Sequence, residues 1–281
     1  MTLRIDAHHH FWDPADFDYP WMADAALDPV RRPFAPGDLA PALSASGIDG
    51  TVLVQTVSDV AETEQFLATA ATTPWVRGVV GWVDLADPAV GDVLDRLIES
   101  SPDALVGIRH QVHDEADPLW LLRDDVQHGL AEVARRSLAY DLLVRTRELP
   151  AAIETVRRLP ELRFVLDHIA KPPIAEGVHE PWSTLIGVLA RNANVDVKLS
   201  GMVTEAQWDR WDATTLAPYI ERVLEAFGAE RAMFGSDWPV CLLAAEDYGT
   251  VVGALDAALA GLSPAEHDAV FGGTAVRAYA L

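Results

Sequence analysis

Residues 3–8 read LRIDAH, a short β-prone run, and His9 and His10 follow it directly. Seven further runs of this kind occur along the chain, and longer helix-like stretches separate them. The eight runs cover residues 3–8, 51–57, 77–83, 104–110, 139–144, 162–168, 194–200 and 231–237. This alternation predicts parallel βαβ units, and eight such units predict closure into an α/β fold of the (β/α)8 (TIM) barrel type.

The stretches between these runs predict helices, which cover residues 36–46, 59–72, 87–99, 126–137, 147–158, 181–192, 213–227 and 245–260. Ser263 is followed three residues later by Glu266, a capping-box pattern that predicts an extra C-terminal helix. A doubly wound open sheet is the alternative, and it usually carries a Gly-rich turn after its first strand. Histidines occupy that turn here, so we expect a barrel that forms one domain over residues 1–281.

Composition and charge argue against several classes of partner. The 281 residues suit a barrel, which typically needs about 250. The formal net charge of -22, without a basic stripe, argues against nucleic acid and anionic membranes as partners. No apolar run approaches the roughly 20 residues of a membrane span, and no secretory signal is recognisable. Cys241 is the only cysteine, so no intrachain disulfide can form, which is typical of a cytoplasmic protein. We also expect a monomer or homodimer that acts on a small-molecule substrate.

Histidines cluster at the end of the first predicted strand. Side chains two positions apart share one face of a strand, so His8 and His10 are expected to point together into the barrel mouth. His9 then points away, and the alternation also predicts that Ile5 and Ala7 face the surrounding helices. Two imidazoles on one face can share a metal ion or flank one substrate oxygen.

Titratable residues also close two later strands. His168 ends the sixth run and Asp237 ends the eighth, which is where the active sites of barrel enzymes lie. Asp237 could be a metal ligand, a general base or both. Each residue alone could be a helix cap or a structural polar group. Matching positions on three strands instead indicate an active site that contains His8, His10, His168 and Asp237.

Longer motifs carry a resemblance to a known family. The segments IDAHHHFWD (5–13), GIRHQVHDE (107–115), LDHIAKP (166–172), VKLSGMVTEA (197–206) and MFGSDWPVCLLA (233–244) resemble the amidohydrolase superfamily. They are most similar to its amidohydrolase-related branch, which contains L-fuconolactonases, L-rhamnonolactonases and dicarboxylate lactonases. The resemblance implies a (β/α)8 barrel and hydrolysis of a sugar-acid lactone, with L-fucono-lactone-like aldonolactones as the expected substrates.

The same resemblance bears on a metal cofactor. Binuclear members place a His or Lys at the end of the fifth strand, and the segment DLLVRT (141–146) has neither at its inward end. One divalent ion, with Zn favoured by the imidazoles, could be held by His8, His10, His168 and Asp237. Metal-independent hydrolysis is the alternative. In either case we expect Asp237 to take the proton of the attacking water and the histidines to stabilise the oxyanion.

Several nearby residues are candidates for substrate binding. Five are predicted to contact the substrate: Arg109, His110, Lys171, Trp12 and Trp238. For Arg109 the alternative is a salt bridge to Asp114 or Glu115 in the following loop. Lys198 lies in an apolar strand and is expected either in an ion pair in the barrel interior or at the substrate.

Two long segments, 11–35 and 111–125, follow strand ends and are expected to wall the site. Within them, Trp21 is interpreted as a packing residue and His113 as an ordinary loop residue.

Two other functions remain open at this point. A metal-dependent decarboxylase of a small unsaturated acid would use a similar set of histidines and one aspartate. A non-catalytic sugar-acid binder on a barrel scaffold would bind without turnover. The concentration of titratable groups at one barrel mouth favours an enzyme over a binder.

Overall fold

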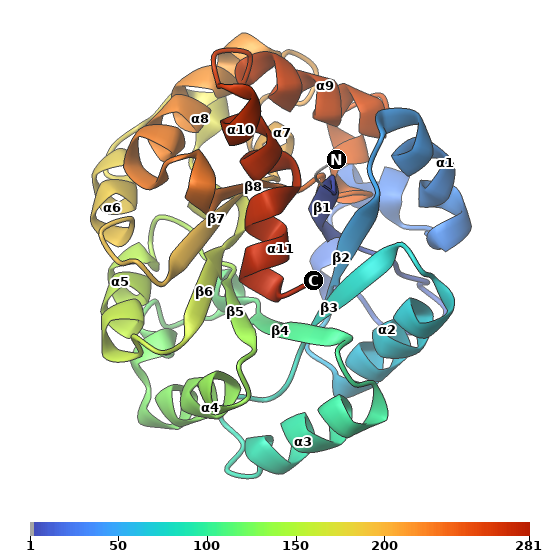
Figure 1. The fold of residues 1–281 in the computed structure, drawn as a ribbon, viewed down its shortest axis with the longest axis vertical. Coiled ribbons are helices and arrows are strands. Elements are labelled where there is room, and N and C mark those ends of the chain that lie inside the picture. The colour runs from blue at the N-terminus through green and yellow to red at the C-terminus, as the bar shows by residue number, and fades with distance from the viewer. Residues whose placement is uncertain (1–2) are drawn as a thin grey trace.

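The computed structural model describes residues 3–281, and its centre is a barrel of eight parallel strands (Figure 1). The strands are β1 (Ile5–His9), β2 (Gly50–Val54), β3 (Val76–Gly81), β4 (Leu105–His110), β5 (Ala139–Leu142), β6 (Arg163–Leu166), β7 (Val195–Leu199) and β8 (Ala232–Phe234). Each strand pairs with the next along the chain. A parallel bridge between His9 and Trp238 joins β1 to the segment after β8, and the predicted (β/α)8 barrel is confirmed.

Helices surround the strands, and most of them form an outer ring (Figure 1). They are α1 (Pro36–Ser46), α2 (Val60–Thr72), α3 (Val90–Ser100), α4 (Asp124–Arg135), α5 (Leu149–Arg158), α6 (Trp182–Leu189), α7 (Met202–Glu205), α8 (Ala213–Phe227), α9 (Tyr248–Ala258), α10 (Pro264–Asp268) and α11 (Thr274–Tyr279). Every predicted helix is present. The helix α7 was not predicted, because its 4 residues are too few to show a helical pattern in the sequence. No helix within residues 3–281 is long and apolar enough to cross a membrane.

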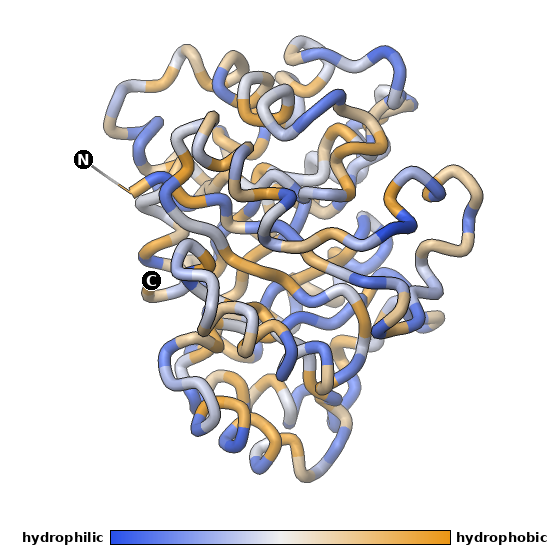
Figure 2. The backbone as a smooth tube through the Cα atoms, turned by 90° about the vertical axis from the view of Figure 1, so that its right-hand side faces the viewer, coloured by the Kyte–Doolittle hydropathy of each residue, from blue (hydrophilic) through white to orange (hydrophobic). Residues whose placement is uncertain are grey.

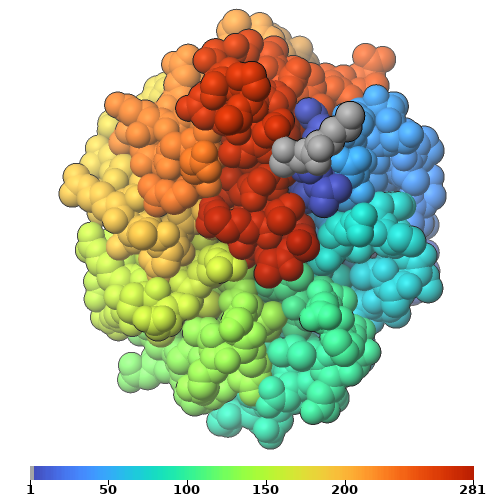
Figure 3. Space-filling model, in the orientation of Figure 1, coloured from blue at the N-terminus to red at the C-terminus, as the bar shows by residue number. Residues whose placement is uncertain are grey.

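The predicted C-terminal helix is present as two short helices. Ser263 caps α10 as expected, because its hydroxyl oxygen accepts from the Glu266 backbone N–H at 3.4 Å and its own backbone N–H donates to Glu266 Oε2 at 2.9 Å. The chain then bends and continues as α11, which lies across one end of the barrel in Figure 1. Ala275, Ala278 and Tyr279 of α11 pack into the barrel interior. In the space-filling view, C-terminal residues cover the middle of this face (Figure 3).

Two apolar cores lie on either side of the strands. The outer core fills the space between strands and helices, and the inner core is made by small and branched residues inside the barrel. The inner core contains Ile5, Ala7, Val52, Val54, Val80, Val106, Ala139, Val165 and Met233. Figure 2 accordingly shows hydrophobic stretches through the middle of the molecule and hydrophilic stretches at many outer turns.

The expected orientation of the apolar residues of β1 is wrong. Ile5 and Ala7 belong to the inner core and do not face the helices. The register between β1 and β2 shifts between Asp6 and His9, so the strand departs from strict alternation through a bulge. His8 therefore also points inward, where it lies 3.2 Å from the Lys198 ammonium of β7. The inward direction of His8 is confirmed, but the regular alternation that predicted it is not present.

The tight contact between α4 and the barrel yields a stability prediction. Gly129 lies in α4, and a Cβ built there would be 2.2 Å from the Leu85 carbonyl oxygen. Alanine usually stabilises a helix by about 1 kcal/mol relative to glycine. Here the clash with rigid backbone reverses that gain, so Gly129→Ala should lower the free energy of unfolding by about 1–3 kcal/mol.

Urea denaturation measures this change, and Gly253→Ala in α9 is the matched control. A Cβ at Gly253 meets nothing within 4 Å, so this variant should be as stable as the wild type or slightly more stable. Equal stability of the two alanine variants would contradict the close packing of α4.

Candidate active site

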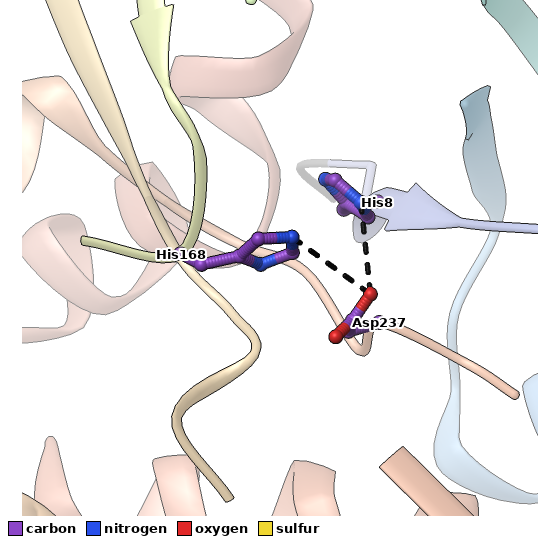
Figure 4. Close-up of side chains that lie close together, drawn as sticks. All are labelled: His8, His168 and Asp237. Carbon is purple, nitrogen blue, oxygen red and sulfur yellow. Dashed lines mark ion pairs between the residues drawn. The ribbon is translucent and has the colours of Figure 1, made fainter. Parts of the chain in front are cut away.

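Four predicted residues meet at the carboxyl ends of the strands. Asp237 Oδ1 lies 3.3 Å from His10 Nε2, 3.7 Å from His8 Nε2 and 3.9 Å from His168 Nε2. Figure 4 shows the His8 and His168 rings on either side of the Asp237 carboxylate. All four side chains are buried. Residues from β1 and from the loops after β6 and β8 thus form one cluster.

The backbone turns sharply where two of these residues leave their strands. His168 has a φ of 51° and Asp237 a φ of 57°, both in the left-handed region that non-glycine residues rarely adopt. Gly201 gives the His168 ring room, since a Cβ at Gly201 would lie 2.5 Å from His168 Nδ1. These conformations aim both side chains across the barrel mouth.

Asp6 holds the two sides of the cluster together. Its Oδ1 accepts hydrogen bonds from the backbone N–H groups of His8 at 3.1 Å and Ser236 at 2.9 Å. Its Oδ2 accepts from the Ser236 hydroxyl at 2.6 Å and from the Tyr248 hydroxyl at 3.0 Å. One buried carboxylate therefore ties the backbone next to Asp237 to that of β1. Sequence reasoning passed over Asp6 because a single acidic residue in a strand has no distinguishing pattern.

Hydrogen bonds orient the imidazole rings. His10 Nδ1 lies 2.7 Å from the Val54 carbonyl oxygen, which only accepts, so the proton is on Nδ1 and the Nε2 lone pair faces Asp237. His168 Nδ1 lies 2.9 Å from the Ser200 hydroxyl. Burial lowers the pKa of His8, His10 and His168, and the Asp237 carboxylate beside His10 and His168 acts in the opposite direction. The net lowering of the pKa favours the neutral rings at neutral pH.

The Asp237 carboxylate is ionised in this setting. Burial acts to raise the pKa of Asp237, but the neighbouring His168 and His10 and the Lys171 ammonium more than offset it. The net pKa of Asp237 is lower than usual. An ionised carboxylate beside neutral imidazoles is able to accept a proton or to bind a cation.

The cluster fits one divalent metal ion. Ligand atoms of His8, His168 and Asp237 all lie within 4.8 Å of one another. Tetrahedral zinc with bonds of 2.0–2.1 Å holds its ligand atoms about 3.3 Å apart. Asp237 Oδ1 lies 3.7 Å from His8 Nε2 and 3.9 Å from His168 Nε2, so small side-chain shifts would bring these atoms to that separation. A second ion is disfavoured, because the Lys198 ammonium lies only 3.2 Å from His8 Nδ1.

A cavity of about 130 Å³ opens above this cluster. The residues that line it are His10, Trp21, Thr56, Arg109, Gln111, His113, Asp114, Leu143, His168, Lys171, Asp237 and Val240. Two of the five predicted substrate contacts, Arg109 and Lys171, are among them. The segments 11–35 and 111–125 both contribute residues, so the prediction that they wall the site is confirmed.

The other three predicted contacts lie elsewhere. Trp12 is buried, and its indole N–H donates to the Val30 carbonyl at 3.0 Å. Trp238 is buried edge-on against Phe34, with ring centres 5.2 Å apart. Neither indole lines the cavity, and their predicted contact with a substrate stays a prediction.

His110 lines an adjoining hollow instead of this cavity. Its Nδ1 accepts from the Trp82 indole N–H at 2.9 Å, and its Nε2 lies 2.8 Å from Glu115 Oε1. Both ring nitrogens therefore have protein partners, and the prediction that His110 binds substrate stays a prediction.

The basic residues have partners that the sequence did not reveal. Arg109 pairs with Asp167 at 3.1 Å, so the expected salt bridge to Asp114 or Glu115 is wrong. Lys198 is in an ion pair in the barrel interior, one of its two expected environments, at 2.5 Å from Asp141. Lys171 pairs with Glu205 at 3.0 Å at the edge of the cavity.

Sequence reasoning missed three residues at the site. Trp21 and His113 line the cavity, although they were interpreted as packing and loop residues. Burial lowers the pKa of His113 to about 3, so this ring is neutral as well. Asp167 lies 3.3 Å from His8 Nδ1. Trp21 and His113 could have been found from their positions in the segments 11–35 and 111–125, and Asp167 from its position next to His168.

Comparisons with known proteins agree with this geometry. The sequence pattern of the family described as Amidohydrolase matches residues 5–281. The chain is 40% identical over 285 residues to the L-fucono-1,5-lactonase of Burkholderia ambifaria, covering 100% of this chain and 97% of that protein. It is 38% identical over 291 residues to the L-fucono-1,5-lactonase of Burkholderia multivorans, with the same coverage. A crystal structure of a Burkholderia multivorans amidohydrolase with bound zinc superposes with a TM-score of 0.93, at 37% identity over 99% of each chain.

The metal fit can be tested by thermal unfolding. Zinc added to chelator-treated protein should raise its melting temperature, because an ion that binds only the folded state at 100 times its Kd stabilises it by about 2.7 kcal/mol. His168→Ala removes one donor of the cluster and should abolish most of this increase.

His267→Ala is the control, because His267 pairs with Asp256 at the surface and should leave the zinc response unchanged. A full zinc response in the His168 variant would contradict the proposed ligand set.

Proposed function

Because this chain belongs to the amidohydrolase family, we infer that it is a hydrolase that opens a sugar-acid lactone. We propose L-fucono-1,5-lactone as its substrate, which is the compound named for two relatives that are 40% and 38% identical over nearly their whole length. The observation that carries the proposal is the Asp237 carboxylate, which faces neutral imidazoles at the floor of a cavity.

In the proposed reaction, water attacks the lactone carbonyl and Asp237 accepts its proton. Asp237 then returns this proton to the ring oxygen as the carbonyl–oxygen bond breaks, which yields the open hydroxy acid. A divalent ion held by His8, His168 and Asp237 would supply Lewis-acid polarisation of the reacting oxygens when bound. Each neutral imidazole keeps the lone pair of one ring nitrogen for this purpose. In His10, the hydrogen bond from Nδ1 to the Val54 carbonyl leaves this lone pair on Nε2.

The cavity walls suit a sugar lactone. Arg109 and Lys171 supply N–H donors for the carbonyl and hydroxyl oxygens of the substrate. Gln111 and Thr56 add further polar groups, and Leu143 provides an apolar surface for the methyl group of a fucono-lactone. We propose that Trp21 covers one side of the sugar ring.

Hydrolysis is favoured over the two alternatives raised by the sequence. The full-length relatives at 38–40% identity are lactonases, which weakens the decarboxylase alternative. The convergence of an ionised carboxylate and three imidazoles argues for an enzyme over a simple binder. The cytoplasmic location and the monomer or homodimer expected from the sequence stay predictions.

Removal of the proposed base is the direct test. Asp237→Asn keeps the shape of the side chain but cannot accept the proton, and general-base catalysis typically contributes about 10²–10⁴-fold. We expect kcat on L-fucono-1,5-lactone to fall by about that factor in a pH-indicator assay. The variant should retain the wild-type circular dichroism spectrum.

Asp209→Asn at the exposed surface is the control and should keep full activity. Wild-type turnover by the Asp237 variant would remove the assignment of the base. Absence of turnover by the wild type on a panel of aldonolactones would overturn the proposed substrate class.

A further inference from the structure

A chain of buried contacts connects the far end of the barrel to His8. Tyr279 of α11 donates a hydrogen bond to Asp141, with its hydroxyl 2.8 Å from both carboxylate oxygens. Asp141 Oδ2 lies 2.5 Å from the Lys198 ammonium, and Lys198 Nζ lies 3.2 Å from His8 Nδ1. These four side chains are at most 3% exposed.

Two groups compete for the same nitrogen of His8. Lys198 Nζ lies 3.2 Å from His8 Nδ1 and can only donate a proton to it. Asp167 Oδ1 lies 3.3 Å from the same nitrogen and can only accept. If Lys198 donates, the ring proton must sit on Nε2, the nitrogen that faces Asp237. If Asp167 accepts, the proton sits on Nδ1 and the Nε2 lone pair faces the site.

Metal binding through Nε2 requires the second arrangement. A histidine ligand usually donates its other ring N–H to a carboxylate, which fixes the tautomer and the ring orientation. Asp167 is placed for that role, and Arg109 holds the other oxygen of its carboxylate at 3.1 Å. The Lys198 ammonium beside Nδ1 and the Arg109 guanidinium, 3.3 Å from Nε2, then act in opposite directions on the tautomer of His8, so the position of Lys198 shifts the balance.

We propose that Tyr279 and Asp141 are positioning residues that set the tautomer of His8 through Lys198. The Lys198 ammonium lies 2.5 Å from Asp141 and 3.0 Å from Asp167 Oδ1, and both carboxylates are nearer to it than His8 Nδ1 at 3.2 Å. Tyr279 bonds to both oxygens of Asp141 and so fixes the direction in which Asp141 attracts the ammonium. His8 Nδ1 is thereby left to Asp167. The inference rests on the proposed use of His8 at the active site, but its test does not need turnover.

A purely structural role is the alternative, because α11 also closes the barrel. Arg277 on the same helix provides the comparison. Its guanidinium pairs with Asp196 at 2.6 Å and has no part in the chain of contacts that leads to His8. Arg277→Gln should therefore loosen α11 without changing His8, whereas Tyr279→Phe keeps the ring packed and removes only the hydroxyl.

The experiment records histidine ring ¹⁵N resonances of the metal-free full chain, together with zinc affinity from competition with a chromophoric chelator. His8→Gln assigns the His8 signals. Tyr279→Phe should move them toward the tautomer with the proton on Nε2 and weaken zinc binding by about tenfold. Its kcat should fall while KM stays near the wild-type value. Arg277→Gln should lower the melting temperature and leave the ¹⁵N resonances and the zinc affinity unchanged.

Unchanged His8 resonances in the Tyr279 variant would overturn the inference, as would equal changes in the Arg277 variant. If the wild type shows no lactone turnover, the proposed function fails while the resonances still decide the role of Tyr279. If the wild type binds no zinc, the proposed metal site fails and the resonances again decide.

Discussion

The pairing of β1 with the segment after β8 is the constraint on which the site depends. The Asp237 backbone N–H donates to the His8 carbonyl at 2.8 Å, and the His10 N–H donates to the Trp238 carbonyl at 2.7 Å. These bonds close the barrel and set the first strand against the last in a fixed register. Residues 8 and 237, which lie at opposite ends of the chain, thereby become neighbours, and Asp6 reinforces the junction through the backbone of Ser236.

Below that junction, the barrel contains a compact set of paired charges. Asp141 and Asp167 lie next to Lys198, and Asp167 also pairs with Arg109. Burial acts to raise the pKa of Asp167, but the cations around it hold its pKa well below the usual range. Buried ion pairs often add little net stability compared with well-packed apolar residues. Their presence directly under His8 is better explained by the position and charge state that they impose on that ring.

The sequence predicts the parts of this structure that depend on local pattern. Strand ends, helix spans and the convergence of His8, His168 and Asp237 follow from alternation and from barrel geometry. The sequence does not predict the bulge in β1, because no local pattern shows that both Ala7 and His8 point into the barrel.

The sequence also does not predict which of several residues of one type lines the cavity, or which residues pair with one another. Trp21 lines the cavity while Trp12 packs behind it, and only the path of the 11–35 segment distinguishes the two indoles. The partners of Lys198 come from β5 and from the end of β6, so they depend on which side chains meet across the barrel. Pairing over such distances in the chain is a property of the closed sheet and not of any local segment.

α11 covers the amino end of the barrel (Figure 3), and the cavity lies at the opposite end, where residues of the segments 11–35 and 111–125 line it. An uncharged lactone arrives, but a carboxylate leaves, and Asp114 stands on the wall that it must pass. Asp114 repels that carboxylate while Arg109 and Lys171 attract it, so the charges of the lining act on the product but hardly on the neutral lactone.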